Sequence, residues 1–407
     1  MQKLFAFSRR IYANHSISAI RKGLLSIFPL IIIASFSTFF LYFPCKVYTD
    51  FMLHVFGRSW QRIFYYTYGV SMGVISVALV ATISYFIAAG GKSTGSGPLS
   101  PSIPCIVSLM CYFSLAWSRG ENNQVFFMSS DGIVIAILCG VFATKLFLSI
   151  YSMIRQKFSH ASPDSDPVLS QAILAVLPAI ITVVLFTILE AIILKLGFKN
   201  ANEPLLNMAY ALLGGIGNAF LKLITVIFMI QIMWFFGVHG NLLLEPILQS
   251  VLGKTTAMGS GIIHITAGSN TSAETLMRTF INVFVLMGGT GCTLCLLTAI
   301  FITARRTGTI RLAKISMLPA IFNINDILIF GLPIVLNPVF FIPFLLTPVV
   351  MLVTSYLAVI SGLVPRISSF VDWTAPPLLN AYYACGSIKG VILQIINMVK
   401  RNQACNG

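Results

Sequence analysis

The stretch Pro319–Pro338, PAIFNINDILIFGLPIVLNP, decides the fold. It lies between two long apolar runs, at or near membrane depth, yet it carries three asparagines, one carboxylate (Asp326), Gly331 and three prolines. Unpaired polar groups are costly in hydrocarbon and proline removes a backbone donor, so a continuous lipid-facing helix cannot hold this stretch. We therefore expect the chain to enter, break and turn back where the broken backbone is buried in protein or lines a watery cavity.

Asp326 is the ionisable residue of this stretch. An ionisable residue at membrane depth is by default a functional one, so Asp326 predicts a ligand site. The alternative is a structural hairpin in which the asparagines, Asn323 and Asn325 among them, only satisfy backbone groups that the break sets free.

The composition predicts an all-α polytopic membrane protein with two helical subdomains. Of 407 residues, 57% are hydrophobic and 9% are charged, and the apolar runs are far longer than the strands of a barrel. The net charge of +15 is better explained by basic loops on the cytoplasmic face than by nucleic acid, for which no module is evident. We expect about ten membrane segments, the eighth in part re-entrant: Leu24–Phe43, Tyr65–Ala89, Ile103–Trp117, Ile133–Ile154, Ala172–Leu196, Asn207–Phe236, Phe280–Thr303, the stretch above, Val339–Leu363 and Pro376–Val399.

The basic segments Met1–Lys22 and Arg305–Lys314 predict the orientation, since both should be cytoplasmic. An even number of crossings must then precede Arg305, whereas seven apolar segments do. Either one early segment does not cross, or part of Gly240–Gly268 does. We favour the second, because that interval contains broken apolar pieces of its own.

The eight cysteines predict no disulfide framework. Most lie in apolar runs, where cysteine behaves as a small hydrophobic residue. Cys292 and Cys295 form a single Cys-x-x-Cys on an expected apolar helix, with no second ligand pair. We expect no metal site and no cofactor.

The same central stretch resembles the signature of enzyme IIC, the membrane subunit of sugar phosphotransferase systems, in its lactose/cellobiose/chitobiose branch. There the pattern runs Asn-Ile-Asn-Glu-Pro, then Phe-Gly-x-Pro-x-x-x-Asn-Pro. In this chain Asp326 stands for the glutamate and Ile327 for the proline.

A second motif, WFFGVHGN at Trp234–Asn241, is similar to the Phe-Gly-x-His-Gly-Asn that marks a sugar-binding position in that family. His239, Gly240 and Asn241 fall on it. Imidazole both donates to and accepts from hydroxyls, and glycine lets the backbone approach a ligand. The alternative is an interfacial histidine that reaches toward water.

Two further motifs have the same resemblance. Within Asn282–Leu297, Gly288, Gly289 and Gly291 are similar to a Gly-Gly-Ser-Gly-Ala-Thr-Leu segment of the family, and they permit either close helix packing or backbone approach to a sugar. VDWTAPP, in which Asp372 replaces a proline of the family pattern, offers Trp373 either for stacking on a sugar ring or as an interfacial belt residue.

The resemblance implies the domain organisation and the partners. Residues 1–200 would form a transmembrane scaffold that mediates a homodimer, and residues 201–407 a sugar-binding domain with re-entrant hairpins. The chain would be the sugar-binding and translocating subunit of a permease for a β-linked disaccharide of the cellobiose, chitobiose or lactose class, in a bacterial plasma membrane. A separate cytoplasmic phosphocarrier subunit would transfer the phosphoryl group.

The resemblance also implies roles for the site residues. Asp326 and His239 would hold the acceptor hydroxyl of the sugar, while Asn323, Asn325 and Trp373 orient its rings. Two other functions stay open on the sequence. One is a sugar-sensing receptor domain that feeds a cytoplasmic signalling domain, which the departures from the family pattern favour; the other is a transporter of the same shape without phosphoryl transfer.

Overall fold

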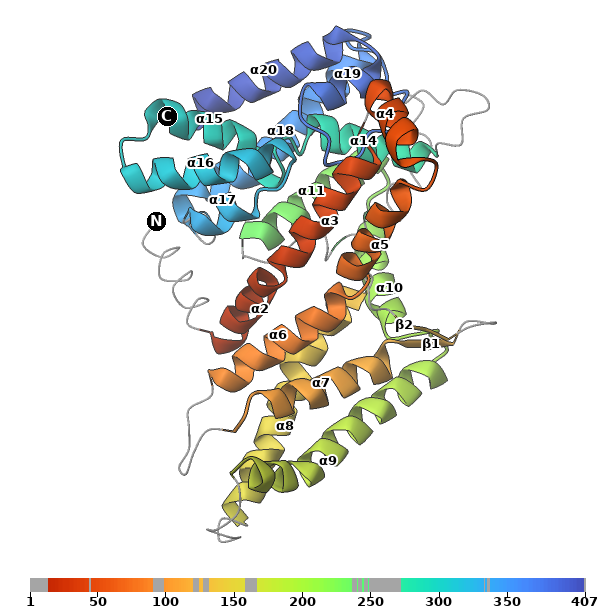
Figure 1. Cartoon of the computed structure of the whole chain (residues 1–407), viewed down its shortest axis with the longest axis vertical. Helices are drawn as coiled ribbons and strands as arrows, with labels where there is room; N and C mark the ends of the chain where they lie inside the picture. The colour runs from red at the N-terminus through yellow and green to blue at the C-terminus, as the bar shows by residue number, and fades with distance from the viewer. Residues whose placement is uncertain are drawn as a thin grey trace. The chain divides into compact units, whose positions relative to one another are not determined.

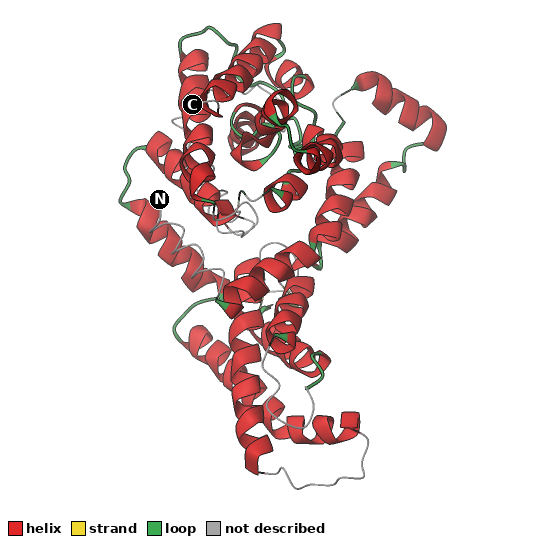
Figure 2. Cartoon of the chain, turned by 90° about the vertical axis from the view of Figure 1, so that its left-hand side faces the viewer, coloured by secondary structure: helices red, strands yellow, loops and turns green. Residues whose placement is uncertain are grey.

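The structure is a computed structural model, and its described part consists of helices joined by loops (red and green in Figure 2), with one short two-stranded ribbon. It describes residues 14–43, 45–90, 99–119, 124–126, 132–157, 167–235, 240, 244, 248, 272–332, 334 and 337–405. The chain forms two compact units. The first, here the C-terminal unit, comprises Met1–Phe5, Ile32–Gly69 and Leu213–Gly407, and the second, the N-terminal unit, comprises Ala6–Ile31 and Val70–Leu212. These units group residues by packing, so the functional division near residue 200 stays a prediction.

The N-terminal unit is built around tight contacts between helices. Its elements are α2 (His15–Ser26), α6 (Ile75–Ala89), α7 (Ser102–Leu115), the antiparallel ribbon β1 (Trp117–Arg119) and β2 (Gln124–Phe126), α8 (Ile133–Lys157), α9 (Pro167–Lys195) and α10 (Asn202–Gly214). Ile83 on α6 packs against Gly23 on α2 and Gly140 on α8, where the missing side chains allow close approach.

Buried hydroxyls join three helices of this unit. Ser84 on α6, Ser108 on α7 and Thr144 on α8 form a closed triangle of hydrogen bonds with Oγ–Oγ distances of 2.7 to 3.2 Å. Thr144 also donates to the Gly140 carbonyl at 2.7 Å. Hydrogen-bonded hydroxyls of this kind hold helices together where apolar burial alone cannot, because lipid is as apolar as a leucine side chain.

The C-terminal unit contains the stretch that decides the fold (Figure 1). Its elements are α3 (Phe28–Leu41), α4 (Lys46–Phe56), α5 (Gln61–Met72), α11 (Ala219–Phe235), α14 (Ala273–Phe284), the 3₁₀ turn η2 (Thr290–Cys292), α15 (Thr293–Thr303), α16 (Thr307–Ile321), α17 (Asp326–Gly331), α18 (Pro338–Ile360), α19 (Leu379–Cys385) and α20 (Ile388–Cys405).

The central stretch breaks and turns back as expected. Helix α16 ends at Ile321, the chain turns through a left-handed residue, Asn323 (φ 61°), and the short α17 follows. Helix α17 runs back along α16, since a Cβ placed on Gly331 would lie 2.6 Å from Cδ1 of Leu312. The predicted hairpin is therefore present, whereas its depth in the membrane stays a prediction.

The predicted all-helical membrane architecture is confirmed, but the span count of ten is not. Among the described residues, five segments are long and apolar enough to cross a bilayer: His15–Leu41, Gln61–Ala89, Ile133–Lys157, Leu169–Lys195 and Phe340–Ile360. Shorter apolar helices occupy Ser102–Leu115, Phe220–Phe235, Thr290–Thr303 and Ile388–Met398. Most of Gly240–Gly268, which we invoke for an extra crossing, lies outside the described residues.

Three expected continuous segments are interrupted, among them Pro376–Val399, which Gly386 (φ 62°) breaks between α19 and α20. Asn207–Phe236 is split between α10 and α11, because glycines follow α10 and the Asn218 side chain caps α11 by accepting from the Phe220 N–H at 2.8 Å. Phe280–Thr303 is broken between α14 and α15 by the glycine run that the sequence placed on a helix. At the glycine run and at Gly386 the backbone has positive φ, so glycine conformational freedom, which a hydropathy profile ignores, explains these two breaks.

Candidate functional site

Three of the sequence motifs meet at the side chain of Asn323, within the C-terminal unit. Its Nδ2 donates to the backbone carbonyls of Trp373 at 2.6 Å and Ala375 at 3.1 Å. Its Oδ1 accepts from the Gly288 N–H at 2.7 Å. Asn323 is 7% exposed, so these are buried bonds, and both amide hydrogens are occupied by backbone acceptors. Asn323 therefore pairs with backbone groups of two other loops, and none of these three partners lies within Pro319–Pro338.

The glycine run is a loop that approaches the central stretch closely. Gly288, Gly289 and Gly291 all have positive φ (70°, 91° and 70°), a conformation that L-residues rarely adopt. A Cβ on Gly289 would lie 2.6 Å from Cγ of Asn325. Asn325 in turn donates from Nδ2 to the Thr290 carbonyl at 2.6 Å. The glycines thus permit backbone approach to the asparagine turn, and helix packing alone does not account for them.

A second network of side-chain amides, formed by Asn380 and Gln394, holds the loop that carries Trp373. Gln394 on α20 accepts at Oε1 from the Leu378 N–H at 2.6 Å and donates from Nε2 to Oδ1 of Asn380 at 2.8 Å. The same Nε2 donates to the Val283 carbonyl at 2.5 Å, at the end of α14. Asn380 donates to the Ala375 carbonyl at 3.2 Å. Segments that are over a hundred residues apart are thus joined by two buried amides.

Trp373 is the exposed member of its loop. It is 36% exposed, whereas its neighbours Asp372 and Thr374 are 9% and 1% exposed. The Asp372 carboxylate accepts from the Thr374 N–H at 3.0 Å and from its hydroxyl at 2.6 Å. Burial raises the pKa of the Asp372 carboxyl, and the hydrogen bonds from Thr374 partly oppose this shift. Asp372 therefore shapes the loop, and the indole stands out as a surface on which a planar apolar face can stack.

The structure brings three predicted site residues together, Asn323, Asn325 and Trp373. It does not describe the side chains of Asp326, His239 and Asn241. Asn323 and Asn325 flank one turn, and Trp373 is tied to it through its backbone carbonyl. Asp326 begins α17 directly after Asn325, but its carboxyl group lies outside the described side chains.

The histidine motif is described at one position only. Gly240 is buried, and a Cβ on it would clash with the Ile230 carbonyl, so Gly240 packs onto α11. His239 and Asn241 lie outside the described residues.

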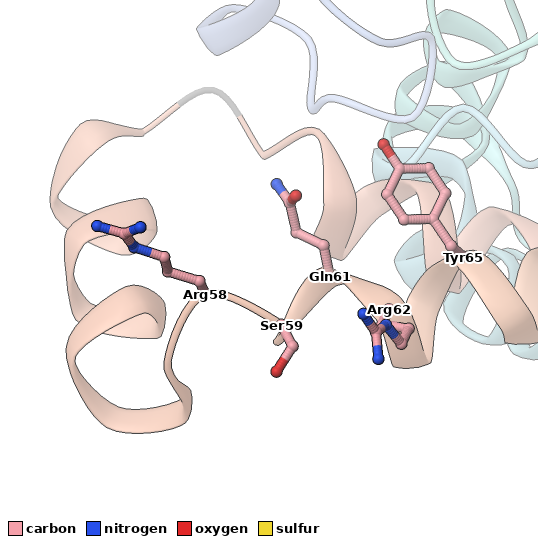
Figure 3. A pocket seen from close by; sticks show the side chains of 5 residues that line it. All are labelled: Arg58, Ser59, Gln61, Arg62 and Tyr65. Carbon is pink, nitrogen blue, oxygen red and sulfur yellow. The ribbon is translucent and has the colours of Figure 1, made fainter.

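A separate open hollow lies at the turn between α4 and α5 (Figure 3). It is lined by Arg58, Ser59, Gln61, Arg62 and Tyr65. In Figure 3 these side chains point in different directions and do not converge on a shared point. This hollow contains none of the predicted site residues.

The sequence profile described as "Phosphotransferase system, EIIC" matches residues 21–348 of the chain. The chain belongs to this family. The matched residues include the glycine loop and the asparagine turn, whereas the Trp373 loop lies beyond them.

Relatives of this EIIC chain match along nearly its whole length. The lichenan permease IIC component of Bacillus subtilis is 27% identical over 98% of this chain and 89% of that protein. The cellobiose-specific EIIC component of Geobacillus stearothermophilus is 27% identical over 95% of this chain and 88% of that protein. A crystal structure of the transporter ChbC, the IIC component from the N,N'-diacetylchitobiose-specific phosphotransferase system, aligns with a TM-score of 0.59 and 25% identity over 98% of this chain and 94% of that chain.

Sequence reasoning missed most of the groups that hold this EIIC site together. Asn380 donates to the Ala375 carbonyl, Gln394 accepts from the Leu378 N–H, and Thr290 offers its own carbonyl to the Asn325 side chain. Nothing in the local sequence predicts these partners. A polar amide within an apolar helix is costly unless paired, and that cost is the signal that marks Gln394.

Proposed function

We propose that this EIIC chain binds and translocates a β-linked disaccharide across a bacterial plasma membrane. The observation that carries the proposal is the convergence of three motifs on Asn323, which joins the glycine loop, the asparagine turn and the Trp373 loop. Cellobiose and N,N'-diacetylchitobiose, for which two of the relatives are named, are both β-linked disaccharides, and this supports the substrate class.

In this proposal Asp326 and His239 hold the hydroxyl that accepts the phosphoryl group. A carboxylate accepts hydrogen bonds from hydroxyls strongly, and a neutral imidazole can donate or accept. Trp373 stacks on a sugar ring, while Gly240 and Asn241 border the histidine. Asn323 and Asn325 orient the rings through the two loops that they hold, since their amides reach the backbone of Trp373 and of Thr290.

The partners follow from the same proposal. A cytoplasmic phosphocarrier subunit presents the phosphoryl group to the held hydroxyl, and the chain itself transfers none. Residues 1–200 form the scaffold of a homodimer, while residues 201–407 carry the sugar. The N-terminal segment and Arg305–Lys314 face the cytoplasm, because basic residues are retained on that side.

The length of the Asp326 side chain provides the test. Aspartate is one methylene shorter than the family's glutamate, which moves the carboxylate back by roughly 1.3–1.5 Å, about one carbon–carbon bond. A site repacked around the shorter acid binds cellobiose no better in the variant Asp326→Glu. The variant Asp326→Asn should bind about 10-fold weaker or worse, because the charged acceptor is lost.

Isothermal titration of purified wild type, Asp326→Glu and Asp326→Asn with cellobiose and other β-linked disaccharides measures these affinities. His239→Ala should weaken the same binding by about 1–3 kcal/mol, through polar partners left unpaired. Equal affinity in all four proteins would remove both residues from the site. No binding of any β-linked disaccharide to the wild type would refute the substrate class.

A further inference from the structure

Gln231 on α11 is a buried amide without a hydrogen-bond partner among the residues that the structure describes. Its side chain is 0% exposed, and within this described part neither Oε1 nor Nε2 is paired. Gln394 is equally buried, but its amide makes three hydrogen bonds. A buried amide loses its bonds to water and gains nothing unless another group replaces them. Gln231 therefore carries a cost that folding alone does not explain, while Gln394 shows how this unit satisfies a structural glutamine.

Two aromatic contacts between α11 and α18 show which residue of α18 lies opposite Gln231. Phe235 contacts Phe341 with ring centroids 4.8 Å apart, and Phe220 stacks on Tyr356 at 4.2 Å. These pairs set α11 and α18 antiparallel, with the residue numbers of facing positions adding to a constant. Gln231 then lies level with Leu345.

This level of α11 is next to two of the motifs that build the site. The ring of Phe344, the neighbour of Leu345, lies against Gly291, since a Cβ there would clash with it, and α11 itself packs against η2. On the chain, Gln231 directly follows Ile230, whose carbonyl lies against Gly240 of the histidine motif. The unpaired amide thus lies on a helix that contacts both the glycine loop and the histidine motif.

We propose that Gln231 is a specificity-determining residue that hydrogen-bonds the hydroxyls of the bound disaccharide. This rests on the proposed function, and it adds a residue that the family motifs do not contain. A primary amide offers one acceptor and two donors, which suits a pair of neighbouring hydroxyls on a pyranose ring. Because the amide is closed to solvent, the contact forms as the packing around α11 opens to the sugar. A buried amide that is paired only by the correct ligand rejects analogues that lack the hydroxyl.

If Gln231 contacts the sugar and forms no hydrogen bond within the protein, Gln231→Met should lower the affinity for the sugar without lowering the melting temperature. Gln231→Met keeps the length and volume of the side chain and removes its polar atoms. The melting temperature of the sugar-free protein should stay the same or rise, because no hydrogen bond is lost. The affinity for cellobiose should fall about 10–100-fold, the effect of leaving buried sugar hydroxyls unpaired. The control Gln394→Met should lower the melting temperature, because the Leu378 N–H and the Val283 carbonyl lose their hydrogen-bond partner.

Titration of wild type and Gln231→Met with cellobiose and its monodeoxy analogues provides the decisive measurement, with Gln231→Leu as a second variant should the first not fold. At least one monodeoxy analogue should bind the wild type more weakly than cellobiose does, and the variant should not discriminate between the two. Wild-type affinity in a folded Gln231→Met or Gln231→Leu overturns this inference alone. A wild type that binds no β-linked disaccharide overturns the proposed function, and this inference with it.

Discussion

Replacing Asn323 should lower the stability of the C-terminal unit, because its side chain hydrogen-bonds backbone groups of two other segments. In Asn323→Gly the Gly288 N–H and the Trp373 carbonyl lose their side-chain partner, whereas the Ala375 carbonyl keeps the bond from Asn380. Each orphaned buried group costs about 1–3 kcal/mol, so the two together cost about 2–6 kcal/mol. At about 2–4 °C per kcal/mol for a domain of this size, the melting temperature should fall by at least about 4 °C.

A second variant separates backbone strain from lost hydrogen bonds. Asn323 has a left-handed backbone with φ 61°, which glycine adopts freely and alanine does not. Asn323→Ala should therefore be less stable than Asn323→Gly and melt at a lower temperature. The expected difference in free energy of unfolding is the roughly 1–2 kcal/mol that the left-handed conformation costs an L-residue. Asn218→Gly is a matched control, since that asparagine is exposed and only caps α11, and a glycine there costs a few tenths of a kcal/mol.

Thermal unfolding of the purified protein, followed by intrinsic fluorescence in one detergent, compares the four proteins. The expected order of melting temperatures is wild type and Asn218→Gly together, then Asn323→Gly, then Asn323→Ala. The reasoning is refuted if Asn323→Gly melts with the wild type. If that variant has also lost affinity for cellobiose, Asn323 is a direct sugar ligand and does not hold the loops.

Three further substitutions test other parts of the structure. Gly289→Ala should destabilise by about 1–3 kcal/mol, because of its positive φ and its contact with Asn325, while Gly215→Ala, with nothing within 4 Å, should not; equal melting temperatures would contradict this. The pKa of Asp372 is raised on folding, so the folded state holds this proton more tightly and wild-type stability should fall as pH rises above the ordinary carboxyl range. Asp372→Asn should flatten that dependence of melting temperature on pH, and an unchanged profile would count against it. Glu190 is buried on α9, and neither of its carboxylate oxygens is paired with any residue in the described part of the chain. The variant Glu190→Leu should be more stable by about 1–3 kcal/mol, and a loss of stability would reveal a partner such as a second copy of the chain.

The sequence predicted the hairpin around Asn323 because its polar content conflicts with its apolar surroundings. That conflict can be read without coordinates, since prolines, glycine and asparagines cannot line a lipid-facing helix. The same reasoning could not say what Asn323 bonds to. Its partners, Gly288 and Trp373, are 35 and 50 residues away, and such pairings depend on long-range packing that no local pattern records.

The glycine loop shows the opposite case. Hydropathy places Gly288 to Gly291 within one apolar run, and the run is indeed buried, yet the backbone there leaves the helix at three positive-φ glycines. Glycine is compatible with both a closely packed helix and a left-handed turn, so the residue type alone cannot choose between them. The choice is made by Asn325, whose side chain occupies the space that a Cβ on Gly289 would need.

The bonds of Asn323 also constrain how the site can move. To shift the Trp373 loop away from the α16–α17 hairpin, the protein must break two hydrogen bonds of Asn323. To shift the glycine loop it must break a third, together with the bond from Asn325 to the Thr290 carbonyl. Broken bonds inside a buried site cannot be replaced by water until the site opens, so the intermediate positions are costly. The glycine loop, the asparagine turn and the Trp373 loop should therefore move as one body. Under the proposed function, this rigidity keeps the geometry of the proposed sugar-binding groups while the domain that carries them changes its position.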